Sequence, residues 1–242
     1  MTIINNRSRS QAVQLERNIF LGILAASLVA LAMAILLPGG RTVDQAPKLP
    51  WLIQIDTTGR ASVFGVTLDH STLAQARDVF RAQGETNLFV NAAQVYTVES
   101  YFQRLFLSGL RGDMVLTLDV DPSLVSAMYE RGLRISQLGS GAKKVKLTEA
   151  DLGILAQARI KHITYIPAAD LDPALLLERF GEPDRRIQEK TGVSHWLYPD
   201  KGLDIAINAD GREVLQYIAP AYFDRILAPL LEDLEETAAG EG

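Results

Sequence analysis

A run of nineteen residues without a charged side chain, residues 19–37, constrains this chain more than any other feature of its sequence. As an α-helix rising about 1.5 Å per residue, the run would be roughly 28 Å long, close to the ~30 Å hydrocarbon core of a bilayer. Its single hydroxyl belongs to Ser27. A helix that is apolar on every side is typical of a membrane span. The sequence therefore predicts a transmembrane helix over residues 19–37.

The same run ends in an A-x-A pattern, Ala32-Met33-Ala34, which resembles a signal-peptide cleavage site. Three further apolar residues follow it, whereas a cleavage region is normally polar and extended. The leader of residues 1–18 is also long for a signal peptide. We therefore favour an uncleaved anchor, with cleavage after Ala34 as the alternative.

The charges on either side of the run predict its orientation. The leader holds Arg7, Arg9 and Arg17, whereas Arg41 and Lys48 are the basic residues that follow closely. Because basic residues are retained in the cytoplasm, this bias places the leader there and the rest of the chain in the periplasm. The sequence thus predicts a single-pass protein of the inner (plasma) membrane.

Small residues recur every four positions along the run, so they share one side of the predicted helix. Such stripes let two membrane helices approach closely. They predict helix packing and a possible homodimer, although alanine is also simply common in membrane spans. The stripe consists of Gly22, Ala26, Ala30 and Ala34.

Composition excludes several classes of chemistry. The chain has no cysteine, which removes disulfides, thiolate catalysis and cysteine-based zinc sites. Its net charge of −5 disfavours nucleic acid as a partner. No spacing of histidines and acidic residues is typical of a metal site, so we predict neither a metal nor a cofactor.

The remaining chain predicts an α+β fold with helices packed on antiparallel sheet. A proline- and glycine-rich linker over residues 38–50 precedes a first unit (51–135), a second unit (136–220) and a helix with an acidic tail (221–242). Each unit reads as a helix followed by three strands, so two tandem α-β-β-β units are one interpretation. The last helix either closes over the sheet or docks a partner.

Several helix starts and one long strand are predicted in detail. Ser71 is the expected cap of the first helix, and Asp121-Pro122 and Asp172-Pro173 open later ones. Residues 95–107 alternate, and the more apolar set includes Arg104 and Phe106. We therefore expect Phe106 to face the core.

The segment from 171 to 218 carries a family resemblance. It contains RFGEPD at the end of a helix, then HWLYPDKGLDIAI and GREVLQYI in an antiparallel meander. These features resemble the BamE/SmpA class of small envelope lipoproteins and the architecture shared with β-lactamase inhibitor proteins. This chain has no cysteine to carry a lipid and has an apolar span instead. The resemblance implies binding to other proteins rather than catalysis.

Two groups of residues are candidate binding sites. Trp196 and Tyr198 share one face of a strand and form either a core stripe, which is favoured, or a contact patch. His195 then lies on the opposite, exposed face. The other group is a basic loop that is either solvated or contacts acidic lipid head groups or partners; it holds Lys143, Lys144 and Lys146.

Catalytic interpretations are weaker. Asp69-His70-Ser71 contains the residue types of a triad, but adjacent side chains diverge, so helix capping is favoured. Asp119 and Asp121 could hold a hard cation but are more typical of a strand end and a helix cap. The sequence therefore favours a protein that is not an enzyme.

These observations predict a single-pass, membrane-anchored periplasmic protein-binding or scaffold module in envelope assembly, secretion or a membrane complex. Its expected contacts are other envelope proteins and, through residues 19–37, membrane lipid. The alternative is a membrane-tethered hydrolase or small-ligand-binding protein with a cleft between the two units. His70, Asp69, Asp119 and His195 would line that cleft.

Overall fold

The computed structural model describes Ser27, Met33 and residues 46–208, 210 and 212–240. The predicted leader and most of the predicted membrane helix and linker lie outside these residues, as do Gly22, Ala26, Ala30 and Ala34. Within the described part, no helix has both the length and the apolar character needed to cross a bilayer. Ala46–Gly242 form one compact unit, to which everything below refers.

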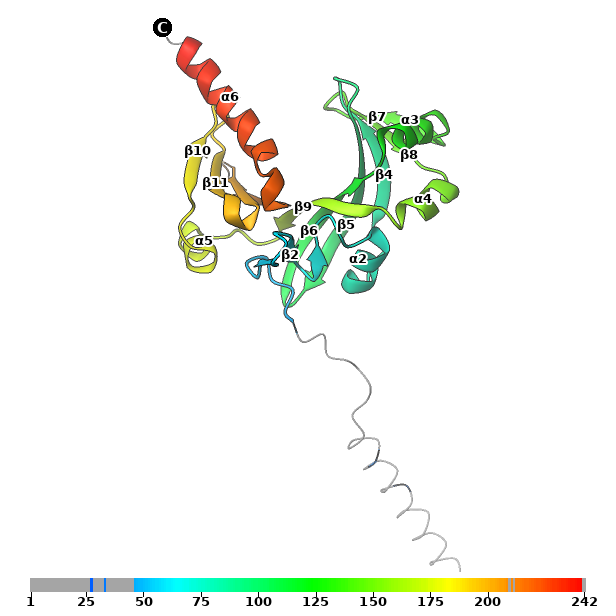
Figure 1. Ribbon diagram of the computed structural model, residues 1–242, viewed down its shortest axis with the longest axis horizontal. Helices are drawn as coiled ribbons and strands as arrows, with labels where there is room; N and C mark the ends of the chain where they lie inside the picture. The colour runs from blue at the N-terminus through cyan, green and yellow to red at the C-terminus, as the bar shows by residue number, and fades with distance from the viewer. Residues whose placement is uncertain (1–26, 28–32, 34–45, 209, 211, 241–242) are drawn as a thin grey trace, which may run out of the picture. The chain divides into compact units, whose positions relative to one another are not determined.

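The unit is built around one antiparallel sheet of ten strands, in the order β10-β11-β12-β13-β9-β6-β5-β4-β8-β7 (Figure 1). A small sheet joins β1 (Gln54–Ile55), β2 (Ala61–Val63) and β3 (Val66–Thr67). The ten strands are β4 (Glu85–Val90), β5 (Tyr96–Leu107), β6 (Leu110–Asp119), β7 (Arg134–Gln137), β8 (Lys143–Lys146), β9 (Arg159–Pro167), β10 (Arg185–Gln188), β11 (Ser194–Tyr198), β12 (Leu203–Ile207) and β13 (Glu213–Ile218).

Five helices of the described region accompany the sheet, which confirms the predicted α+β class with helices packed on antiparallel strands. They are α2 (Leu73–Phe80), α3 (Pro122–Glu130), α4 (Glu149–Leu155), α5 (Pro173–Phe180) and α6 (Asp224–Gly240), with 3₁₀ turns at Pro199–Lys201 and Pro220–Tyr222. Both meanders, β4–β6 and β11–β13, belong to the same sheet, because β9 pairs with β6 and with β13. The boundary expected between residues 135 and 136 falls inside β7, and the tandem duplication stays a prediction.

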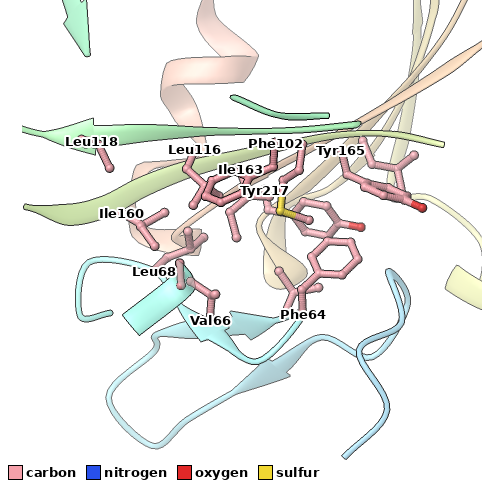
Figure 2. Packing of buried hydrophobic residues seen from close by; sticks show 14 of the residues in the cluster. Phe64, Val66, Leu68, Phe102, Leu116, Leu118, Ile160, Ile163, Tyr165 and Tyr217 are labelled. Carbon is pink, nitrogen blue, oxygen red and sulfur yellow. The ribbon is translucent and has the colours of Figure 1, made fainter. Parts of the chain in front are cut away.

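The main core lies between one face of the sheet and the elements that cover it. Phe64, at the turn between β2 and β3, places its ring centroid 5.0 Å from that of Tyr165 and 5.6 Å from that of Tyr217. Figure 2 shows this packing, with Val66 and Leu68 beside it. The buried Tyr217 hydroxyl also donates to the carbonyl of Pro50 at 2.9 Å, which ties the entering chain to β13.

A second, smaller apolar cluster lies on the opposite face of the sheet, beneath α6. Phe223 and Leu230 pack there against Ile187, Leu197 and Ile218. The C-terminal helix therefore closes over β10, β11 and β13, one of the two roles expected for it. Figure 1 shows it running alongside β10 and β11.

The helix starts follow local chemistry, with one correction. Asp121 and Asp172 cap α3 and α5 as predicted, each followed by proline. The expected cap Ser71 is wrong, because Thr72 begins α2: its hydroxyl accepts from the Gln75 N–H while the Gln75 side chain accepts from the Thr72 N–H. This reciprocal pair satisfies two free donors at once, and the Ser71 hydroxyl instead accepts from the Thr67 N–H at 3.0 Å.

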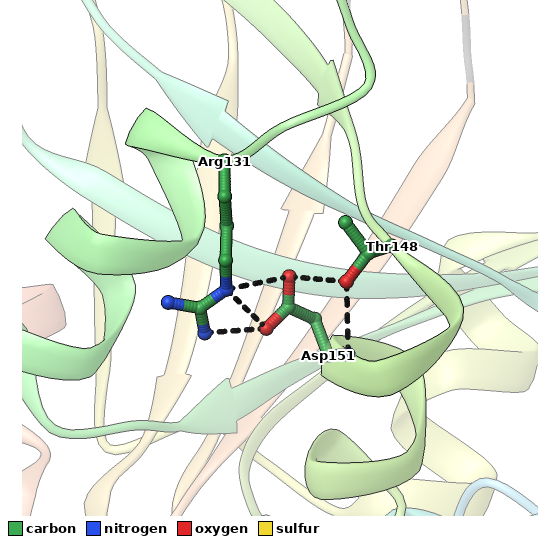
Figure 3. A network of polar contacts seen from close by, with 3 residues as sticks. All are labelled: Arg131, Thr148 and Asp151. Carbon is green, nitrogen blue, oxygen red and sulfur yellow. Dashed lines mark hydrogen bonds and ion pairs between the residues drawn. The ribbon is translucent and has the colours of Figure 1, made fainter.

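Helices α3 and α4 are joined by a buried carboxylate. Arg131 Nε donates to Asp151 Oδ1 at 2.9 Å, and the Thr148 hydroxyl donates to Asp151 Oδ2 at 2.7 Å (Figure 3). Burial raises the pKa of Asp151, but these hydrogen bonds and the Arg131 charge outweigh it and leave the pKa below its ordinary value. The contact fixes α4 against the end of α3.

The prediction of which β5 side chains face the core is wrong beyond Phe102. A bulge between Phe102 and Leu105 shifts the register against β6, with Arg104 in the left-handed region at φ 49°. Because one extra residue inverts the alternation, Leu105 and Leu107 are buried whereas Phe106 is 67% exposed.

Candidate functional site

The aromatic pair predicted on β11 lies in the core. Trp196 is 8% exposed and Tyr198 is 2% exposed, and the Tyr198 hydroxyl donates to the Gly181 carbonyl at 2.9 Å. The Arg186 guanidinium lies 4.6 Å from the centroid of the Trp196 ring and covers it. Trp196 and Tyr198 therefore form the core stripe that the sequence favours, and not an exposed contact patch.

His195 does lie on the opposite face of β11, but the expectation that it is exposed is wrong. It is 6% exposed, and its Nδ1 is 2.9 Å from Asp204 Oδ2 while its Nε2 is 3.0 Å from Glu189 Oε1. Burial lowers the pKa of His195, but the hydrogen bonds and charges of Asp204 and Glu189 outweigh it and raise the pKa above 6.5. The two carboxylates thus favour the protonated form of His195, whose single positive charge balances one of their two negative charges.

The three lysines predicted in a basic loop belong instead to strand β8, which pairs with β4 and β7. Lys144 forms an ion pair with Glu85 at 2.9 Å, and Lys146 is exposed. Gly139 and Gly141 form the turn of this hairpin rather than part of a long loop, because residues on both sides of them pair as strands. Lys143 is half-buried.

The residues proposed for a catalytic cleft do not converge on His195. Asp119 forms an ion pair with Lys161 at 3.0 Å, and burial followed by the Asp119 charge raises the pKa of Asp69. His70 is exposed, and none of these three lines the cavity that His195 lines. Asp121 caps α3 through the Ser123 N–H at 2.9 Å. Among described residues, no group of three or more histidines, cysteines or acidic residues could hold a metal.

An apolar cavity that sequence reasoning missed lies at the hairpin between β5 and β6. It encloses about 400 Å³. Its walls come from the chain entering the unit, the hairpin, the end of β9 and the segment that follows. We call this the hairpin site; its main side chains are Trp51, Phe106, Leu110, Tyr165 and Leu171.

The β5 bulge builds this site and is itself held by specific contacts. Asp113 of β6 accepts the Arg104 N–H at 2.7 Å and the Tyr101 hydroxyl at 2.5 Å. At the tip, Ser108 and Gly109 adopt φ of 49° and 92°, and the Ser108 hydroxyl accepts the Lys48 N–H at 2.6 Å. One set of contacts on this hairpin therefore orients Phe106, and another holds the entering chain against its tip.

The chemistry of the hairpin site suits apolar contact rather than catalysis. Among the residues that the structure describes, Arg111 is the one charged residue of its lining, and Tyr165 supplies the one hydroxyl; no carboxylate or histidine of this part of the chain lines it. The sequence did contain a signal for it: Gln103-Arg104 places two polar residues in succession within an alternating strand. Such a break in phase is what a bulge produces.

In comparisons with known proteins, no family model, no curated protein and no solved structure matches this chain. The resemblance to BamE/SmpA-like lipoproteins therefore stays a prediction.

Proposed function

We propose that this chain is a non-catalytic scaffold anchored by a single membrane helix, with its folded unit in the periplasm, and that the hairpin site binds an apolar segment of another envelope protein. The observation that carries the proposal is Phe106: a phenylalanine 67% exposed at the mouth of an apolar cavity.

Exposing Phe106 to water costs free energy, and the contacts of the fold nevertheless hold it there. Leaving a phenylalanine side chain in water forgoes roughly 2 kcal/mol of burial. The bulge that turns it outward also holds Arg104 in a left-handed conformation, which costs a non-glycine residue about 1–2 kcal/mol. Bulges that re-aim a side chain and strained backbone both concentrate at functional sites, and exposed aromatic anchors beside pockets are typical of binding hot spots.

The proposed partner lies in or against the same membrane. The chain between residues 37 and 46 spans at most roughly 30 Å when fully extended. The entering chain is bonded at Lys48 to the hairpin tip itself, so few residues separate the hairpin site from residues 19–37 along the chain. A short tether therefore presents this site to apolar segments that neighbouring membrane proteins expose on the periplasmic side.

In-cell crosslinking of the tagged full-length protein, followed by mass spectrometry, tests the proposal. We expect Phe106→Ser to reduce the yield of the main crosslinked envelope protein at least tenfold. Val95→Ser is the matched control, because Val95 is 54% exposed before β5, at the other end of that strand. Equal yields for the two variants would contradict the proposal.

The proposed topology has its own test. A reporter that is active only in the periplasm, fused after residue 242, should be active in intact cells. Activity only from a cytoplasm-specific reporter would place the folded unit on the other side of the membrane.

A further inference from the structure

A second cavity, of about 450 Å³, lies between α6 and the outer face of the sheet. Its floor is polar because strand pairing brings hydrogen-bonding side chains together: Thr117 of β6 lies opposite His162 of β9, and Thr164 of β9 lies opposite Gln216 of β13. Directly paired residues of antiparallel strands share a face, so these four side chains form one surface. We call this the histidine cavity.

The roof of the histidine cavity is mostly apolar. Ile226, Pro229 and Leu230 of α6 line it, together with Ile218 from β13. Arg225 belongs to the same helix and also lines the cavity, and its side chain is exposed to solvent. Its guanidinium lies 4.5 Å from the centroid of the Tyr222 ring, and no ion pair joins it to another residue of the described region. The cavity thus has a polar floor, an apolar roof and a positive mouth.

The Nε2 atom of His162 is the polar group of the cavity that lacks a hydrogen-bond partner in the described region. This atom is buried. A buried polar atom left unpaired costs about 1–3 kcal/mol, and such atoms are rare in folded proteins. Thr117, Thr164 and Gln216 line the same space, yet none of them approaches Nε2 within hydrogen-bond distance.

The charges around the cavity favour an anion next to His162. Burial, then the charges of Lys161 and Arg225, lower the pKa of His162 to about 4, so the ring is neutral at physiological pH. The carboxylates on the opposite wall, Asp204 and Glu189, are already paired with His195. An incoming anion next to His162 therefore meets the positive charge of Arg225, which also acts on the Asp69 carboxyl. The far wall repels it less than two free carboxylates would, because a proton on His195 balances one of their two charges.

We propose that the histidine cavity binds a small organic carboxylate: its oxygens accept hydrogen bonds from His162 Nε2–H and the Arg225 guanidinium, and its apolar body packs beneath Ile226 and Leu230. Planar, bidentate pairing with carboxylate is the geometry that guanidinium favours. A volume of this size suits a ligand of about ten to twenty non-hydrogen atoms. This site is independent of the hairpin site.

Benzoate is a suitable probe, with benzamide as its neutral counterpart of nearly the same shape. The full-length protein, labelled with ¹⁵N-histidine in detergent micelles, would be titrated while the imidazole resonances are followed by NMR. We expect a saturable shift of the His162 Nε2 resonance with benzoate and at least tenfold weaker binding of benzamide. Phe106→Ser should bind benzoate as the unaltered protein does, which separates this proposal from the proposed function.

Two arginine variants locate the contact. Arg225→Gln should weaken benzoate binding at least tenfold, and because Arg225 is exposed this change leaves the core intact. Arg212→Gln is the matched control: Arg212 is an exposed arginine that pairs with Asp210 at 3.3 Å. It should bind benzoate unchanged.

Three results would overturn the proposal. One is the absence of saturation at about 10 mM benzoate, where a site with a Kd near 1 mM would be roughly nine-tenths full; the cavity then holds water. A second is equal binding of benzamide, and the third is equal binding of inorganic phosphate, either of which removes the preference for carboxylate.

Discussion

Replacing Gly202 by alanine is expected to lower the free energy of unfolding by at least about 3 kcal/mol. Gly202 ends the turn between β11 and β12 at φ +62°, and an added Cβ would lie 1.9 Å from the carbonyl oxygen of Ile218. That oxygen belongs to backbone at the end of β13, so it cannot move aside as a flexible side chain would. The Ile218 N–H also donates to the Gly202 carbonyl at 2.9 Å, and relieving the clash would disturb this bond.

The measurement is urea denaturation of the variants. Two other glycines separate the effect of backbone strain from the effect of the steric clash. Gly59 has φ +80° but open space around a Cβ, so Gly59→Ala should cost only about 1 kcal/mol of backbone strain. Gly153 lies in α4 with an ordinary φ and open space, so Gly153→Ala should raise stability by about 0.5–1 kcal/mol. A Gly202→Ala protein as stable as Gly59→Ala would show that the contact with Ile218 is not as close as described.

Replacing His195 by alanine is expected to destabilise the protein by about 3–5 kcal/mol at neutral pH, because it leaves the fully buried Asp204 carboxylate without a cation. Glu189 loses the same partner but keeps the Thr191 hydroxyl at 2.7 Å. His70→Ala is the matched control: His70 is exposed, and its replacement should change stability by less than about 0.5 kcal/mol.

The stability that His195 contributes should depend on pH in a definite direction. His195 has a folded-state pKa above its ordinary value of 6.5, so the stability it contributes is complete below about pH 6.5 and is lost as pH rises through the folded-state pKa. The unaltered protein should therefore lose stability over that range, and His195→Ala should not. Burial raises the pKa of Asp204, so the deficit of the variant should shrink in acid as Asp204 protonates. Parallel stability curves for the two proteins would rule out a charged pair.

Local chemistry explains what the sequence could predict of this fold. Asp121-Pro122 and Asp172-Pro173 begin helices because a carboxylate cap and a proline with fixed φ act within a few residues. The three C-terminal strands are equally predictable, because each is a short run rich in apolar residues and turn residues separate them. Predicting these helix starts and strands required no contact with a distant part of the chain.

The candidate sites depended on contacts that no local pattern carries. Alternation continued through Gln103-Arg104 predicts that Phe106 faces the core, whereas Asp113, on the next strand, holds the bulge that reverses it. No local pattern distinguishes His162 from other strand residues, since only the pairing of β9 with both β6 and β13 places it in a cavity with His195.

The most direct test of the account is photo-crosslinking from position 106 in intact cells. A photoreactive phenylalanine analogue at Phe106 should form an adduct with a membrane-embedded protein. The same analogue at Leu133, which is 63% exposed near β7 at the far end of the sheet, should not form that adduct. No protein adduct from position 106, or the same adduct from both positions, would contradict the claim that the hairpin site binds a membrane partner.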